Sequence, residues 1–226
     1  MLGAFSATLK RVVVLFSAAS LAGLGASAQD APKSAPPAPT AFTAISPIFS
    51  QLVMHSLPAA FVTVSENATA TNYIREAVLK GETAERWTQM ITVTGFKQLA
   101  ANPQVTPQSF AGGIASGFKQ ACPASFISKG LGSTKVGTHD AFLAVASCGS
   151  VGAGAAAHSE TALIFAVKGA ADVYTLQWAE RGAASATPLA IDDAKWGPRF
   201  AALGPIRLCP IVPGEKAPFP SCVNQK

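Results

Sequence analysis

The first 28 residues have the three-part pattern of a secretory signal peptide, and this feature constrains the rest of the chain most. Lys10 and Arg11 form a short positive region, an apolar run extends from Val12 to Leu24, and Ala26-Ser27-Ala28 provides an A-x-A cleavage site. The apolar run is shorter than the about 20 residues needed to cross a bilayer. We therefore expect cleavage after Ala28 and no integral membrane span in the mature chain. The domain would then fold outside the cytoplasm, in the periplasm or after secretion, where disulfides persist.

The four cysteines are an even number in a chain expected to be exported, which predicts two disulfides. Three pairings are possible, and we favour Cys122 with Cys148 and Cys209 with Cys222. The first pair would join a helix to a strand, and the second would close the Pro-rich tail. A metal or redox site is the alternative interpretation. The chain has no C-x-x-C motif and no histidine at ligand spacing from a cysteine, so no metal site is predicted.

Composition divides the chain into a signal peptide at 1–28, a Pro/Ala-rich disordered spacer at 29–44 and a single domain at 45–226. Charged residues make up only 13% of the sequence, and the formal net charge is +5. Loss of Lys10 and Arg11 with the signal lowers that charge by two. The remaining cations are spread along the chain without the basic stripe that nucleic-acid binding requires. We therefore expect no nucleic-acid partner, and an envelope protein or a small ligand instead, with the oligomeric state left open.

Several segments have the composition and the period of two that are typical of strands with one buried face. In the segment from Arg86 to Phe96, alternation predicts that Trp87, Ile91 and Val93 share one face and that three threonines share the other. The remaining predicted strands are Phe61 to Ser65, Ala70 to Leu79, Ser125 to Lys129, Ala141 to Ser147, Thr161 to Lys168 and Asp172 to Arg181.

Two other segments have helical patterns. Thr106 is a suitable N-cap before Pro107, and Phe110, Ile114 and Phe118 then recur at a spacing of four. Glycines 112, 113 and 117 lower the helix propensity, and we expect them to allow a close approach to the sheet. A second helix is predicted from Asp192 or Asp193 to Leu203, with Pro198 tolerable only in its first turn.

The order strands, helix, strands, helix with short connections predicts an α+β fold: a mainly antiparallel β-sheet covered by two α-helices and stapled by the two disulfides.

No nucleophile-elbow, zinc-protease or calcium-loop motif occurs, and no cofactor is predicted. The glycines from Gly149 to Gly154 fit a hairpin loop better than a phosphate site. Two pairs could supply acid–base chemistry, His139 with Asp140 and His158 with Glu160. Adjacent strand residues point to opposite faces, which argues against the first pair. The second pair supports the alternative of an envelope hydrolase or transferase. Whether the chain is an enzyme therefore stays open, but the missing catalytic motifs favour a non-enzymatic protein.

Trp87, Gln89, Trp178 and Glu180 form the candidate ligand or partner face. If their strands are neighbours, these aromatic and polar side chains could line a groove. The alternative interpretation is that both tryptophans belong to the core beneath the helices, because large aromatic residues usually dominate cores.

Three stretches carry a resemblance to other proteins: the stretch from ERWTQMITV at 85–93 through Cys122-Pro123, VYTLQWAER at 173–181, and RLC at 207–209. In these stretches the chain resembles uncharacterised exported proteins of Gram-negative bacteria, a resemblance that implies a periplasmic location and assigns no functional residue. The order of elements is also similar to the Mog1/PsbP-type α/β/α sandwich. The leading hypothesis is a non-enzymatic, soluble binding or accessory protein of the cell envelope; a purely structural subunit is a third possibility.

Overall fold

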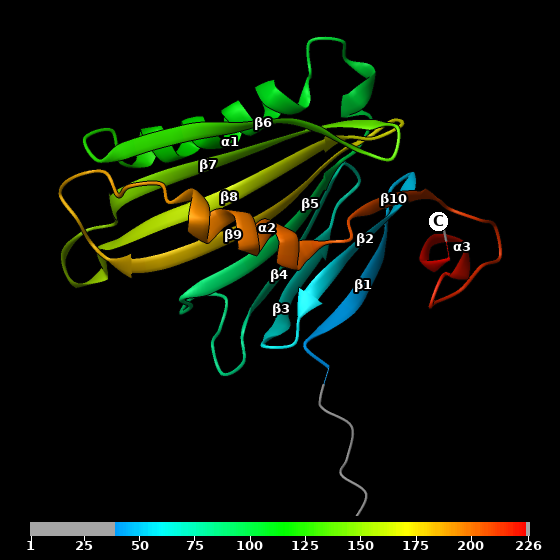
Figure 1. Cartoon of the computed structure of the whole chain (residues 1–226), viewed down its shortest axis with the longest axis horizontal. Coiled ribbons are helices and arrows are strands. Elements are labelled where there is room, and N and C mark those ends of the chain that lie inside the picture. Colours follow the sequence, from blue (N-terminus) through cyan, green and yellow to red (C-terminus); the bar gives the residue numbers. More distant parts are fainter. Residues whose placement is uncertain (1–38, 225–226) are drawn as a thin grey trace, which may run out of the picture. The chain divides into compact units, whose positions relative to one another are not determined.

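The computed structural model describes residues 39–224, which contain ten strands and three α-helices (Figure 1). The predicted signal peptide and most of the predicted spacer lie outside the described residues. Within residues 39–224, no helix is both long and apolar enough to cross a membrane. The strands are β1 Ala41–Ile48, β2 Gln51–Pro58, β3 Phe61–Ala68, β4 Asn72–Leu79, β5 Gln89–Phe96, β6 Phe126–Val136, β7 His139–Val151, β8 His158–Lys168, β9 Val173–Ala183 and β10 Arg207–Pro210. The helices are α1 Pro107–Ala121, α2 Asp193–Leu203 and α3 Pro220–Val223, with short 3₁₀ turns at Leu99–Ala101 and Gly154–Ala156.

The strands form two antiparallel sheets, which confirms the predicted α+β class. The large sheet has seven strands in the order β3-β4-β5-β9-β8-β7-β6, and the small sheet has the order β1-β2-β10. The small sheet is not predicted by the sequence. Its first strand begins at Ala41, so residues 41–44 belong to a strand and not to the spacer. Pro47 is compatible with β1 because β1 lies at the edge of its sheet.

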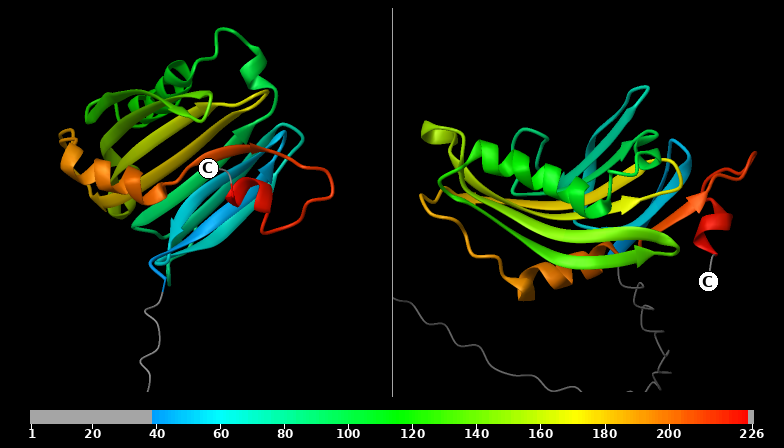
Figure 2. Two further views of the ribbon diagram at one scale, coloured as in Figure 1. Left: turned by 45° about the vertical axis from the view of Figure 1, so that its right-hand side comes forward. Right: turned by 90° about the horizontal axis from the view of Figure 1, so that it is seen from above.

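Helix α1 covers one face of the large sheet, over β6, β7 and β8 (Figure 2). Its start follows the predicted signals: Thr106 and Ser109 form a reciprocal capping box, and Pro107 occupies the first turn. Ala111 and Ala115 of the helix are buried in the cluster against the sheet, with Phe110, Ile114 and Phe118 packed beside them. The expectation that the glycines allow the close approach is therefore wrong. Gly112, Gly113 and Gly117 face open space, and alanines make the close contact.

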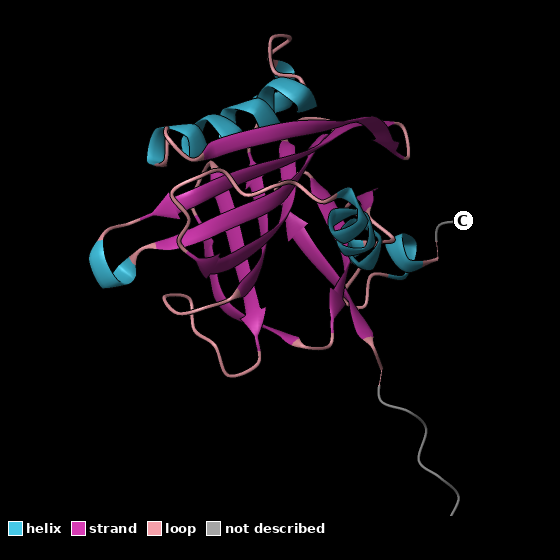
Figure 3. Ribbon diagram, turned by 60° about the vertical axis from the view of Figure 1, so that its left-hand side comes forward, coloured by secondary structure: helices cyan, strands magenta, loops and turns pink. Residues whose placement is uncertain are grey.

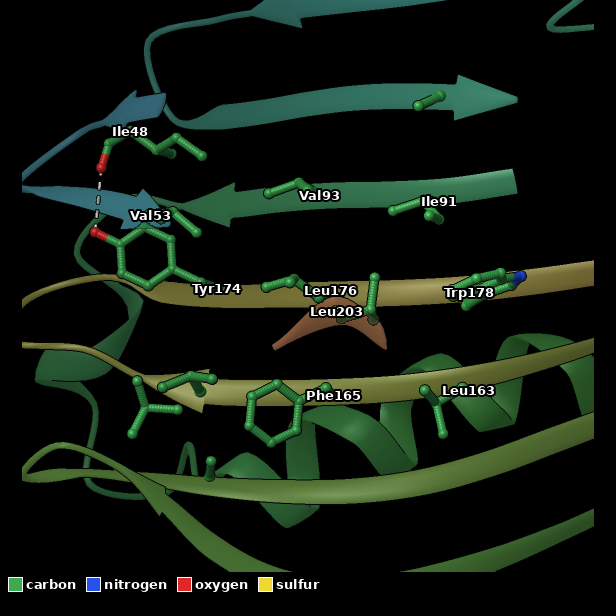
Figure 4. Close-up of a cluster of buried hydrophobic side chains, with 14 of the residues drawn as sticks. Ile48, Val53, Ile91, Val93, Leu163, Phe165, Tyr174, Leu176, Trp178 and Leu203 are labelled. Atoms are coloured by element: carbon green, nitrogen blue, oxygen red, sulfur yellow. Dashed lines mark hydrogen bonds between the residues drawn. The ribbon is translucent and has the colours of Figure 1, made fainter. Parts of the chain in front are cut away.

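The opposite face of the large sheet is covered by α2 and by the small sheet, which together enclose the main core (Figures 3 and 4). Trp196 and Leu203 of α2 are buried there, together with Ile48 and Val53 of the small sheet. Pro198 lies in the second turn of α2, which contradicts the expectation that the first turn alone tolerates it. The helix therefore lacks one amide donor, and burial of its apolar side offsets this loss.

Both predicted disulfides are present. Cys122, which caps the C-terminus of α1, is bonded to Cys148 of β7 with a Cα–Cα distance of 5.8 Å. Cys209 of β10 is bonded to Cys222 of α3 with a Cα–Cα distance of 5.5 Å. The first bond joins helix to sheet and the second closes the tail, as the pairing predicted.

A buried polar network links the small sheet to β4. Arg75 Nη2 donates to His55 Nε2 at 2.8 Å, and its Nη1 donates to Ser46 Oγ at 2.5 Å. The other ring nitrogen of His55 donates to the Ser56 carbonyl at 2.9 Å. Burial lowers the pKa of His55 from 6.5 to about 4, an effect that the Ser56 carbonyl opposes and the Arg75 charge reinforces. The native state therefore requires a neutral ring.

This network predicts that stability falls as the pH falls. Because His55 resists protonation only in the native state, the unfolded chain binds one more proton between about pH 6.5 and about pH 4. The resulting loss between about pH 7 and about pH 4.5 is roughly 2.5 kcal/mol. Urea unfolding at these two pH values should show that His55→Gln loses less free energy of unfolding on acidification than the wild-type protein does, by that amount. An equal loss in the variant would show that other groups account for it.

A second prediction concerns α1. Gly113 is exposed and an added Cβ would meet no atom within 4 Å, so Gly113→Ala should stabilise the protein by about 0.5–1 kcal/mol. Gly149→Ala is the contrasting variant, because its Cβ would collide with the carbonyl oxygens of Thr187 and Ser185. Thermal unfolding should raise Tm for the first variant and lower it for the second. A lower Tm for Gly113→Ala would contradict the placement of this residue.

Candidate functional site

Three of the four predicted face residues come together beside α2. Trp178 and Glu180 are two residues apart on β9 and therefore project from the same face. Gln89 begins β5 and lies directly opposite Glu180 in the register. Trp178 Nε1 donates to Gln89 Oε1 at 3.1 Å, which orients the indole ring. Trp178 is only 5% exposed and its ring packs edge-to-face on Phe61, so Trp178 is also a core residue.

Helix α2 adds two cations that sequence reasoning missed, Lys195 and Arg199. Their spacing of four places both on one side of the helix, and each forms an ion pair with Glu180. The Arg199 guanidinium lies 4.9 Å from the centre of the Trp178 ring and 5.9 Å from that of Trp196. The cluster therefore contains two positive charges and one carboxylate above an aromatic floor. The sequence does show a cation on either side of Trp196, but it does not show their acidic partner, Glu180, which lies on a distant strand.

These side chains border a cleft of about 300 Å³, lined by Trp178, Ala194, Lys195, Pro198, Arg199 and Ala202. Two groups in this region are left to bind a further hydrogen-bond partner. Arg199 Nε is buried and finds no acceptor among the described residues. Pro198 has no N–H for the carbonyl of Ala194, one turn earlier. Lys195 is the accessible member of the cluster, with 45% of its side chain exposed. We call this feature the α2 cleft.

Trp87 lies apart from the other three predicted residues, in the core cluster beneath α1. It was expected to share a face with Ile91 and Val93, which belong to the cluster on the opposite side of the sheet. That expectation is wrong because β5 begins only at Gln89, so strand alternation does not extend to Trp87. Trp87 is 8% exposed, and the Arg181 guanidinium lies 3.8 Å from the centre of its ring.

The two histidine pairs have different geometries. His139 Nε2 lies 3.3 Å from the side-chain nitrogen of Gln51, whereas Asp140 pairs with Lys135 on the surface, so His139 and Asp140 diverge. His158 and Glu160 do approach each other, with 3.7 Å between Nε2 and Oε2. Their remaining contacts are structural: His158 Nδ1 binds the Ala156 carbonyl at 2.9 Å, and Glu160 accepts a hydrogen bond from Arg181 Nε at 3.0 Å. Across residues 39–224, no three His, Cys, Asp or Glu side chains are grouped closely enough to hold a metal ion.

Comparisons with known proteins give only distant structural similarity. No protein-family model and no curated protein matches the sequence, so the resemblance to exported Gram-negative proteins stays an expectation. The structure is similar to the Ran-binding protein Mog1p of Saccharomyces cerevisiae, with 10% identity and a TM-score of 0.38 over 70% of this chain and 84% of that one. It is also similar to LpqN of Mycobacterium tuberculosis, involved in cell envelope biogenesis, with 9% identity and a TM-score of 0.36 over 75% and 92% of the two chains. Similarities at these scores carry no functional inference.

Proposed function

We propose that this chain is a non-enzymatic binding or accessory protein of the cell envelope, and that it contacts an acidic segment of a partner protein through the α2 cleft. The predicted signal peptide and the two disulfides support a location outside the cytoplasm. The resemblance to exported proteins of Gram-negative bacteria favours the periplasm as that location. The proposed binding function is independent of this location, because it follows from the charge and shape of the α2 cleft.

The observation that carries the proposal is the pair of cations that shares a single carboxylate over Trp178. Because Glu180 neutralises only one of Lys195 and Arg199, the cleft keeps one surplus positive charge. An incoming carboxylate would meet the exposed Lys195 first, and the apolar part of the incoming side chain could pack on Ala194, Pro198 and Ala202, which line the cleft and are exposed. Arginine and tryptophan are also the residue types enriched at the centres of protein interfaces.

The His158–Glu160 pair gives less support to the hydrolase alternative. Glu160 is held by the Arg181 cation, and the Nδ1 of His158 is engaged by a backbone carbonyl. We therefore propose binding and not catalysis.

The proposal is tested by capture of partners from envelope extract with the mature chain and two charge-reversed variants. Lys195→Glu should lower recovery of the specific partner at least about tenfold, because it places like charges at the contact. Lys119→Glu is the matched control: it makes the same charge change at an exposed site on α1, on the opposite face of the sheet, and should not alter recovery.

The partner identified in this way should also have an acidic segment whose neutralisation abolishes binding. Equal loss of the partner in both variants would indicate non-specific attraction to cations and would contradict the assignment. A partner that is retained fully by Lys195→Glu would contradict it as well.

A further inference from the structure

A second hollow lies on the other side of the large sheet, beside the C-terminal half of α1. It has a volume of about 260 Å³ and is lined by Ile114, Gly117, Phe118, Ala121, Cys148, Val151 and Glu160. Helix α1 provides one wall, and β7 and β8 provide the other. We call it the α1 groove. Its lining is apolar apart from Glu160, the one charged residue that reaches it.

One carboxylate oxygen of Glu160 accepts a hydrogen bond within the protein, and the other has no hydrogen-bond donor among the described residues. Oε2 accepts a hydrogen bond from Arg181 and lies 3.7 Å from His158 Nε2. Among the described residues, no donor contacts the other oxygen, Oε1. Oε1 is not buried in the free protein, so water reaches it. A ligand that covers this oxygen must replace the water with a hydrogen-bond donor, because a carboxylate oxygen buried without one is costly.

The position of this carboxylate is fixed before any ligand arrives. Arg181 holds Oε2, and the guanidinium of Arg181 is itself stacked on Trp87 at 3.8 Å. The Cys122–Cys148 disulfide ties the end of α1 to β7, so the two walls of the groove are covalently joined. A pre-organised site loses little conformational freedom on binding.

We propose that the α1 groove binds a small, mainly apolar molecule that carries one hydrogen-bond donor, with the apolar part between α1 and the sheet and the donor on Glu160. The volume lies just below the about 300–1,000 Å³ of sites for drug-sized ligands, which suits a smaller molecule. An anionic head group is excluded because it would face the carboxylate. A head group without a donor would bury that carboxylate oxygen unpaired.

The first experiment compares three probes with nearly equal apolar parts: octan-1-ol, its isomeric ether 1-methoxyheptane, and octanoate. Binding is followed by chemical-shift changes of backbone amides in the mature protein. We expect octan-1-ol to shift the amides of Gly117, Phe118 and Cys148. The ether should bind at least about tenfold more weakly, because it cannot donate to Glu160. Octanoate should cause no shifts in these amides.

Two glycine variants then locate the site on the helix. Gly117 lines the groove, and its added Cβ would meet no atom within 4 Å, so Gly117→Leu should fill the groove without disturbing the fold. Gly113→Leu is the matched control, one turn earlier, equally unobstructed and outside the groove lining. Octan-1-ol binding should be lost in the first variant and retained in the second.

Each other outcome contradicts a part of the proposal. Equal affinity for the alcohol and the ether would show that Glu160 selects no donor. Loss of binding in both variants, or in neither, would place the site elsewhere. Absence of any shift with octan-1-ol would overturn the proposal. None of these results depends on the α2 cleft, which lies on the opposite face of the sheet.

Discussion

The arrangement of the two sheets depends on one buried carboxylate, that of Asp172, which is 1% exposed at the turn between β8 and β9. Its Oδ2 accepts hydrogen bonds from Ser50 N at 3.0 Å, from Ser50 Oγ at 2.5 Å and from Tyr174 Oη at 3.1 Å. Its Oδ1 accepts a fourth from Gln98 N at 2.7 Å. Burial alone would raise the pKa of Asp172, but these donors outweigh it and lower the pKa. The carboxylate thereby joins the β1–β2 turn, the segment that follows β5, and β9.

The α2 cleft depends on this junction because α2 is connected to both sheets. Its N-terminus follows the loop after β9, and its C-terminus leads into β10, which pairs with β2 of the small sheet. Ser56 of β2 also donates to the carbonyl of Gly204, at the end of the helix, at 2.6 Å. A shift of the small sheet would therefore move Lys195 and Arg199 relative to Trp178. The α1 groove has a separate support in the disulfide between α1 and β7.

Local signals predicted much of this structure, and contacts between distant residues account for the rest. Helix α1 was predictable because Thr106, Pro107 and the spacing of Phe110, Ile114 and Phe118 all act within the segment itself. The disulfides followed from four cysteines in a chain with a signal-like start. Strand β10 of the small sheet escaped prediction because it is four residues long and joins β2 from about 150 positions away in sequence. Likewise, nothing near Glu180 in the sequence indicates that residues 195 and 199 will neutralise it, and nothing near Asp172 indicates that Ser50 and Gln98 will bind it.

Hydrogen exchange in Asp172→Asn tests the central role of this carboxylate most directly. Asparagine has the same size, but at least one donor of the set would face an amide NH₂, and buried donors without acceptors cost about 1–3 kcal/mol each. In Asp172→Asn we expect the amides of Leu52, Val53 and Met54 to exchange about a hundredfold faster, while those at the centre of β7 and β8 change much less. Asp140→Asn, at an exposed aspartate paired only on the surface, should leave these rates within about twofold. Unchanged protection of β2 in Asp172→Asn would contradict the account.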